Sequence, residues 1–258
     1  MRRGTSRYLK LRDYSITVGI SHHLTNLGAL LNYAYSKGYI AIIPFFPMEP
    51  RHNSGKKKKT QLTEYIDYDT LTLDGEPIQV CLDDSQLDPS DIAVIDPSQR
   101  LLRKDPLFAD IPNRCMRFQY VKEIRDTAEA IVSQITDNGK NEYTCIHVRR
   151  TDRMTNRDHA RDTSVPRILD RIQKCENKLV YIMTDESPMF FAELQSNPAY
   201  RVLLYTGFDI LRKIKIQDNY MLFCVENLIM KGASKRVSTF RSSPAYYNYS
   251  LSDVPGWQ

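Results

Sequence analysis

The sequence has little glycine and no long apolar run. Only 10 of its 258 residues are glycine, and no segment reaches the roughly 18 consecutive apolar residues that a membrane-spanning helix requires. Collagen-like chains, glycine-rich linkers and membrane bundles are therefore excluded. Charged residues make up 26% and hydrophobic residues 41% of the chain, a balance typical of folded domains. The length allows one large domain or two small ones, at about 100–200 residues each.

The sequence also lacks the cysteine pairs of a metal site. Its five cysteines are widely spaced and none belongs to a C-x-x-C pair, so we expect no zinc site. The odd count argues against a disulfide framework, and the apolar neighbours of Cys145 and Cys224 indicate reduced core cysteines. We therefore expect a soluble, cytoplasmic protein without an integral membrane segment. The basic start, Met1–Arg7, leads into no apolar region and does not resemble a signal peptide. An anchor missing from the sequence stays open as an alternative.

The charge balance is only mildly basic. Lysine and arginine number 36 against 31 aspartates and glutamates, a net charge of +5, and four of the lysines form the run Lys56–Lys59. A nucleic-acid binder usually has a stronger and more clustered excess, so we expect no nucleic-acid partner. The chain contains no G-x-x-x-x-G-K-[ST] loop, which leaves a P-loop phosphotransferase without support. A mild excess still suits an enzyme whose substrate carries phosphates.

The second half of the sequence alternates between strand and helix patterns. We predict strands at 143–148, 179–183, 201–205 and 236–240, and helices at 120–138, 166–175, 188–195 and 218–231. The strands are apolar almost throughout, which indicates a parallel sheet covered on both faces. Asp218 is the expected N-cap of the last helix.

The first half is less regular. We predict strands at 14–18, 39–43, 78–82 and 92–95, a helix at 23–37, and a polar, lysine-rich, mobile loop at 47–63. The predicted fold class is therefore α/β with two lobes. We assign residues 1–115 to the N-terminal lobe and residues 116–258 to the C-terminal lobe.

Two adjacent arginines stand at the carboxyl end of the first strand of the second half, in the sequence H-V-R-R-T-D at 147–152. Ligands of open parallel sheets bind at this end of the strands. The planar fork of Arg149 or Arg150 suits a phosphate, which it holds with two hydrogen bonds. A surface network between these arginines and Asp152 explains the same residues equally well.

Two further predicted strands end in polar clusters. Asp185 lies in T-D-E-S-P at 184–188, where the carboxylates either line a site or simply cap the next helix. The segment S-T-F-R-S-S-P at 238–244 offers hydroxyls and backbone N–H groups, which suit an anion. A plain serine N-cap is the alternative there, and the residues alone favour it.

The segment G-I-S-H-H at 19–23 joins a predicted strand to a helix. Glycine permits a tight turn and a close approach of the backbone to a ligand. His23 is a candidate general base, although a structural role is the commoner one for a histidine.

Three segments together resemble one family. They are H-V-R-R-T-D at 147–152, Y-I-M-T-D-E at 181–186 and V-S-T-F-R-S-S at 237–243. In this order they resemble the three motifs of the α1,6-/protein-O-fucosyltransferase superfamily, which includes the core α1,6-fucosyltransferases and the bacterial nodulation fucosyltransferases. H-V-R-R-T-D is the specific motif of the three. The resemblance covers residues 143–250, and G-I-S-H-H stands where the family has a G-x-G-N-Q-like turn.

The resemblance implies a GT-B fold, with two Rossmann-like lobes and a cleft between them. The N-terminal lobe would face the acceptor and the C-terminal lobe would hold the nucleotide sugar. By position, Arg149 would hold the β-phosphate and stabilise the leaving group, Arg150 would support it, and His147 would lie near the base or ribose. The other implied donor-binding residues are Asp185, Thr239, Phe240, Ser242 and Ser243.

The sequence departs from the family at two places. The family has an acid before its third motif that recognises guanine, whereas this chain has Ser234 there. A UDP sugar such as UDP-xylose is therefore a rival donor to GDP-fucose. The family's acid after the first motif falls on Arg157, next to Asp158. We predict that Asp158 is the base that deprotonates the acceptor hydroxyl, with Asp152 and His23 as alternatives.

The resemblance implies an inverting, metal-independent glycosyltransferase. It would move fucose from GDP-fucose, or xylose from a UDP sugar, onto a hydroxyl of a glycan or glycoprotein. It would need no cofactor besides this nucleotide-sugar co-substrate. The alternative is a non-catalytic module of the same fold that binds a glycan or a nucleotide sugar.

Overall fold

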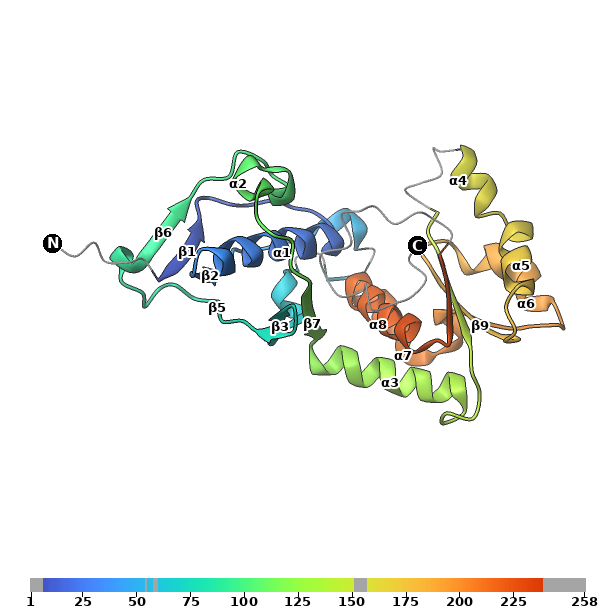
Figure 1. Ribbon diagram of the computed structural model, residues 1–258. Helices are drawn as coiled ribbons and strands as arrows, with labels where there is room; N and C mark the ends of the chain where they lie inside the picture. Colours follow the sequence, from blue (N-terminus) through green and yellow to red (C-terminus); the bar gives the residue numbers. More distant parts are fainter. Residues whose placement is uncertain (1–6, 54, 58–59, 151–156, 239–258) are drawn as a thin grey trace. The chain divides into compact units, whose positions relative to one another are not determined.

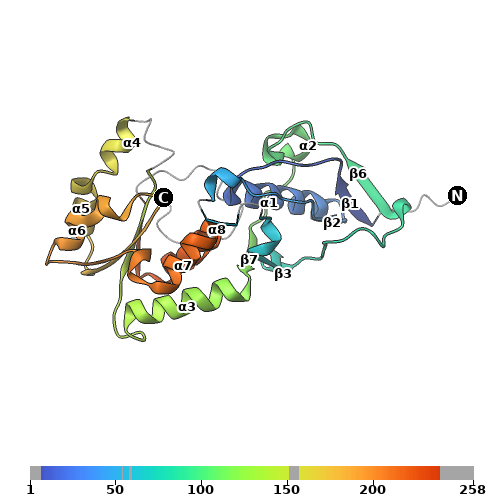
Figure 2. The ribbon, with the colours of Figure 1, turned by 180° about the vertical axis from the view of Figure 1, so that it is seen from behind.

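The structure is a computed structural model that describes residues 7–53, 55–57, 60–150 and 157–238 (Figures 1 and 2). The chain divides into two compact units between Val121 and Lys122. Gly55 and Lys56 belong with the second unit, although they precede this division in the sequence. Each unit is built around its own parallel sheet.

The first unit contains a four-stranded sheet in the order β5-β2-β1-β6. Its strands, all parallel, are β1 (Tyr8–Leu11), β2 (Ile40–Ile42), β5 (Val80–Cys81) and β6 (Ile92–Ile95). Helix α1 (Ile20–Ser36) packs beside β2 and buries Leu24, Leu27 and Leu31, which recur at helical spacing. It ends before Gly38, whose φ of 74° stops the helix. The predicted helix at 23–37 and the strands at 39–43, 78–82 and 92–95 are thus confirmed, although only two residues of 78–82 belong to a strand.

The strand predicted at 14–18 is wrong. Tyr8–Leu11 fills the central position of the sheet instead, where it pairs with both β2 and β6. The alternation in 14–18 is real, because Ile16 is buried and its neighbours are exposed. Tyr14, however, accepts a hydrogen bond from Asn26 Nδ2 at 2.7 Å and donates one to the Arg100 carbonyl at 2.9 Å. The alternating pattern of 14–18 therefore reflects the burial of one side chain between exposed neighbours, and not pairing in a sheet.

A second, antiparallel sheet in the first unit has no counterpart among the predictions. It contains β3 (Ile66–Leu73), β4 (Glu76–Pro77) and β7 (Met116–Tyr120), in the order β4-β3-β7. Asp74 and Gly75 join β3 to β4 with φ values of 52° and 91°, the positive angles of a tight hairpin turn. Because β7 pairs with β3, the first unit extends to Val121. The unit's short helices are η1 (Pro50–His52), η2 (Leu62–Glu64), η3 (Pro89–Asp91), η4 (Leu102–Lys104) and α2 (Pro106–Ala109).

The second unit follows the predicted strand and helix alternation. Its parallel sheet, in the order β10-β9-β8-β11, contains β8 (Thr144–Val148), β9 (Leu179–Thr184), β10 (Arg201–Leu203) and β11 (Lys235–Ser238). The predicted helices are α3 (Lys122–Thr136), α5 (Val165–Gln173), the pair η6 (Pro188–Phe191) and α6 (Ala192–Ser196), and α8 (Asn219–Gly232). Asp218 caps α8 as predicted, accepting from the N–H groups of Tyr220 and Met221. Helices α4 (Arg157–Asp162) and α7 (Asp209–Gln217), and the turn η7 (Tyr205–Gly207), were not predicted.

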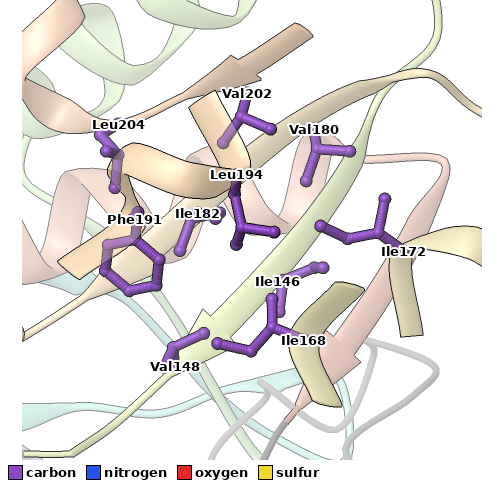
Figure 3. Close-up of a cluster of buried hydrophobic side chains, with 10 residues drawn as sticks. All are labelled: Ile146, Val148, Ile168, Ile172, Val180, Ile182, Phe191, Leu194, Val202 and Leu204. Atoms are coloured by element: carbon purple, nitrogen blue, oxygen red, sulfur yellow. The ribbon is translucent and has the colours of Figure 1, made fainter. Parts of the chain in front are cut away.

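Helices cover both faces of this sheet, with α5 and α6 on one side and α3, α7 and α8 on the other (Figures 1 and 2). The face toward α5 and α6 is apolar (Figure 3) and contains Ile146, Val148, Ile168, Ile172, Val180, Ile182, Phe191, Leu194, Val202 and Leu204. Successive residues of a strand point to opposite faces. Cys145, His147 and Tyr181 therefore lie on the other face, toward α8, which we call the polar face.

None of the helices among residues 7–238, as far as these are described, is long and apolar enough to cross a membrane. The five cysteines, all within the described ranges, are not joined in disulfides, and three of them are buried.

Candidate functional site

The three motif segments follow neighbouring strands of one sheet. Ser238 of β11 pairs with His147 of β8, which in turn pairs with Met183 of β9. The carboxyl ends of these parallel strands therefore lie at the same edge of the sheet, where ligands of such sheets bind. Asp152, Thr239, Phe240, Ser242 and Ser243 lie outside the described residues. The described candidates at this edge are His147, Arg149, Arg150 and Asp185.

Arg150 is buried, with 8% of its surface exposed. Its Nε donates to Glu186 Oε2 at 3.1 Å, and its Nη1 donates to the carbonyl and hydroxyl of Thr163 at 2.8 and 2.9 Å. The guanidinium carbon lies 4.1 Å from the centre of the Phe190 ring. The side chain is thus occupied by contacts within the protein.

Asp185 accepts a hydrogen bond from the backbone N–H of Arg150, with a distance of 2.7 Å to Oδ1. This bond joins the end of β9 to the end of β8. The N-cap residue of η6 is Ser187 rather than Asp185, and the Ser187 N–H donates to Oε1 of the neighbouring Glu186 at 2.9 Å. Asp185 therefore fixes the backbone at the strand ends.

His147 and Arg149 are close enough for the charge of Arg149 to act on the His147 ring. Burial, together with a smaller effect of the positive charge of Arg149, lowers the pKa of His147 to about 3. His147 is therefore neutral at physiological pH, whereas Arg149, which is half-buried, keeps its charge. A partly exposed cation beside a neutral imidazole suits an anionic ligand.

The helices α7 and α8, which cover the polar face, bring two further ionisable residues to the sheet. Glu226 of α8 accepts a hydrogen bond from the Tyr181 hydroxyl at 2.8 Å, and burial raises its pKa to about 8. Lys215 of α7 donates to Asn219 Oδ1 at 2.6 Å and lies 5.8 Å from the centre of the Tyr205 ring. Burial lowers the pKa of Lys215, while the carboxylates of Glu226 and Asp185 act against that shift. Lys215 thus brings a second cation near Asp185.

Sequence reasoning missed Lys215 because it missed α7. Only Leu211 and Ile214 of this helix are buried, which is a weak apolar stripe. It also missed Thr163 and Phe190 as partners of Arg150, since neither belongs to a motif. Glu186 was visible in the T-D-E-S-P segment, but nothing in the sequence distinguished it from its neighbour Asp185.

The candidate bases have different surroundings. His23 lies in the first turn of α1, is fully buried, and contacts the Pro47 carbonyl at 2.8 Å through Nε2. Burial lowers its pKa to about 4. Asp158 belongs to α4, but its side chain lies outside the described part of the structure, as does all of Asp152.

Ser234 lies at the amino end of β11, four residues before Ser238. Its Oγ donates to the Tyr143 carbonyl at 3.1 Å and accepts from Asn177 Nδ2 at 2.7 Å. The residue therefore stands at the opposite end of the strand from the edge that carries His147 and Arg149. Its lack of a carboxylate is a poor guide to the ligand bound at that edge.

Within the described ranges, no group of three or more histidine, cysteine, aspartate or glutamate residues could hold a metal ion.

The chain has two units, each with its own parallel sheet, and the motif residues lie at the carboxyl edge of the second sheet. This is the fold class predicted above, α/β of the GT-B type. The sequence matches no protein-family model and no curated protein. The fold, in contrast, is similar to solved structures of the fucosyltransferase NodZ, which confirms the predicted class and, at the level of the fold, the predicted resemblance.

Three of these structures illustrate the similarity. NodZ α1,6-fucosyltransferase soaked with GDP-fucose has a TM-score of 0.54 and 13% identity, over 94% of this chain and 90% of that one. Selenomethionine-labelled NodZ from Bradyrhizobium has a TM-score of 0.55 and 13% identity, over 97% and 93%. NodZ co-crystallised with GDP has a TM-score of 0.51 and 13% identity, over 94% and 90%.

Proposed function

We propose that this protein is a glycosyltransferase that takes fucose from GDP-fucose and transfers it to a glycan hydroxyl. The observation that carries the proposal is the position of H-V-R-R-T-D directly at the carboxyl end of β8, in a fold similar to that of NodZ structures containing GDP-fucose or GDP. The argument for UDP-xylose depended on Ser234, and the placement of Ser234 at the other end of β11 removes that argument. GDP-fucose is therefore the donor that we propose.

The proposed reaction is a single displacement that inverts the anomeric carbon. The acceptor oxygen forms a bond to that carbon while the bond to the diphosphate oxygen breaks, and GDP leaves with the electron pair. Negative charge grows on the departing diphosphate, and a positioned arginine stabilises such charge strongly in a site that excludes water. Arg149 supplies that charge in our proposal, and no metal ion is required.

The acceptor hydroxyl loses its proton to a base in the same step. We propose Asp158 for this role, because this acidic residue of α4 stands one position after Arg157, where the family resemblance places the acid that follows the first motif. His23 is a weaker candidate, since it is fully buried and its Nε2 is bound to the Pro47 carbonyl. Asp185 would act on the donor side, holding the turn that carries Arg149 through the N–H of Arg150.

The test is a transfer assay with GDP-fucose and a panel of glycans, with UDP-xylose as the competing donor. We expect fucose transfer by the wild type, unchanged by a chelator. Arg149→Ala should lower kcat about 100- to 1000-fold, the usual effect of losing one charge-stabilising donor. Asp158→Asn should lower kcat at least about 100-fold, and the exposed Lys213→Ala serves as the control.

The outcomes separate the alternatives. Binding of GDP without turnover of GDP-fucose on any acceptor or water would identify a non-catalytic module. Preference for UDP-xylose would overturn the proposed donor. Full activity of Asp158→Asn would overturn the proposed base and leave the rest of the proposal standing.

A further inference from the structure

We propose, on the basis of the proposed function, that Arg150 is a positioning residue that holds three segments of the donor site together without contacting the diphosphate. Its side chain and backbone bind the end of β9 through Glu186 and Asp185, and the turn after α4 through Thr163. Arg149, the adjacent residue, is left as the arginine that meets the donor. The two arginines of the motif thus have different tasks.

The contacts of Arg150 occupy the groups that would otherwise bind phosphate. A guanidinium has five N–H donors in one plane. Nε donates to Glu186, Nη1 is shared between two acceptors of Thr163, and one face of the plane covers the Phe190 ring. Bidentate phosphate binding by arginine uses two parallel donors on one edge of the fork. With 8% of the residue exposed, Arg150 lacks such an edge.

The same contacts explain why the position matters for catalysis. The N–H of Arg150 is bound to Asp185 and its side chain to Glu186, so the backbone next to Arg149 is fixed from two sides. Thr163 directly follows α4, the helix that contains the proposed base Asp158. Through these contacts Arg150 connects the backbone beside Arg149, the proposed cation for the leaving group, to the end of α4, the helix that contains the proposed base. Displacements of about 1 Å in such groups cost up to about 100-fold in rate.

A substitution of Glu186 distinguishes the positioning role of Arg150 from direct binding of Arg150 to the diphosphate. If Arg150 bound the diphosphate, removing Glu186 would delete a competing carboxylate and tighten GDP binding. If Arg150 positions its neighbours, removing Glu186 loosens the anchor, and GDP binding weakens. The two roles therefore predict opposite signs for the same substitution.

The experiment measures the Kd of GDP and the kcat of GDP-fucose turnover for wild type, Arg150→Ala, Glu186→Ala and the double variant. We expect both single variants to weaken GDP binding about threefold or more and to lower kcat at least about tenfold. The double variant should be no worse than the poorer single one, since both remove one contact pair. Measurements are made where circular dichroism shows every variant folded, because a merely structural role would leave kcat of the folded protein unchanged.

Two further variants keep the result interpretable. Arg150→Lys retains the charge but loses the fork and the stacking on Phe190, so we expect it to be as impaired as Arg150→Ala. Glu186→Gln replaces Glu186→Ala if the latter does not fold. Arg167→Ala, on the exposed side of α5, should behave as wild type.

Tighter GDP binding by Glu186→Ala, additive effects in the double variant, or near-normal activity of Arg150→Lys would overturn the positioning role while leaving the proposed function intact. A wild-type protein that binds no GDP would overturn the proposed function itself, and this inference with it.

Discussion

At the residue scale, burial determines which groups near the candidate site carry charge. His147 is neutral because its ring is desolvated, and the nearby charge of Arg149 makes protonation still less favourable. Glu226 shows the opposite consequence of the same cause, since burial favours its uncharged, protonated form. Arg149 therefore lies beside a neutral imidazole, and burial favours the uncharged form of Glu226 on the polar face.

Acidification should destabilise the protein through His147. Its pKa is about 3 when folded and about 6.5 when unfolded, so between these values the unfolded chain binds a proton that the folded chain does not. Stability therefore falls as the pH drops below about 6.5, by up to about 2 kcal/mol from this residue between pH 7 and 5. His147→Gln should reduce the pH dependence of the free energy of unfolding, measured by urea titration at both values. His23 adds a dependence of the same sign in both proteins.

The exposed His52→Gln is the matched control and should retain the wild-type pH dependence. An identical pH dependence in His147→Gln and wild type would contradict a neutral, buried His147.

Glu226 should produce the opposite pH dependence. Its pKa is raised to about 8, so between pH 4.5 and 8 the folded chain holds a proton that the unfolded chain has lost. Its contribution is present at low pH and is lost as the pH rises through this window. Glu226→Gln keeps a neutral partner for Tyr181 and should raise stability at pH 8 relative to pH 5 by roughly 2–4 kcal/mol.

Thermal unfolding at the two pH values measures this effect, with the exposed Glu129→Gln as the control. A variant that is less stable than wild type at pH 8 would show that Glu226 is held in its ionised form.

At the element scale, the clearest constraint is the packing of Gly55 against the end of α7. A Cβ atom on Gly55 would lie 2.5 Å from the carbonyl oxygen of Gln217, closer than real Cβ contacts come. The next residue, Lys56, donates its N–H to the Ile216 carbonyl at 2.9 Å. The lysine-rich segment, expected to be a mobile loop, therefore has a defined attachment at these two residues.

Gly55→Ala should destabilise the second unit by about 1–3 kcal/mol, the usual cost of overpacking against atoms that cannot move aside. The neighbour is backbone, so relaxation requires a shift of the junction between α7 and α8. Differential scanning calorimetry measures the effect. Gly207→Ala is the matched control, since a Cβ there meets nothing within 4 Å, and equal stability of the two variants would contradict this account.

The elements of the second unit could be predicted because each strand is a short apolar run bounded by turn residues. The antiparallel sheet of the first unit also left a local signal, the Asp74-Gly75 pair after the alternating residues of β3. The error at 14–18 was of another kind, because its alternation reflects the burial of Ile16, and Val18 forms only an isolated bridge, to Met48. Pairing depends on a neighbour distant in sequence, which a local pattern does not contain.

At the scale of the whole molecule, the division into two units leads to a testable prediction about ligand binding. The candidate site belongs to the second unit, which has its own core around β8 and β9. A ligand that binds only the folded second unit should stabilise that unit by mass action.

Hydrogen exchange should localise this effect. At a GDP concentration about 100 times its Kd, amides of 144–148 and 179–184 that exchange through unfolding of the second unit should slow by about 100-fold. Amides of β3 and β7 in the first unit should change little. The comparison with UDP at the same concentration is the control, and equal slowing in both units would show that they unfold as one.

The sequence by itself determined the alternation of the second unit, the cap at Asp218 and the three motifs at the ends of predicted strands, because these depend on residues close together in the chain. Only the tertiary structure decided that Arg150 is occupied by Glu186, Thr163 and Phe190, and that Ser234 stands at the far end of β11. Two adjacent arginines look alike in a sequence. In the folded protein, Arg150 is buried among its hydrogen-bond partners. Arg149 is half-exposed at the edge of the sheet where ligands bind.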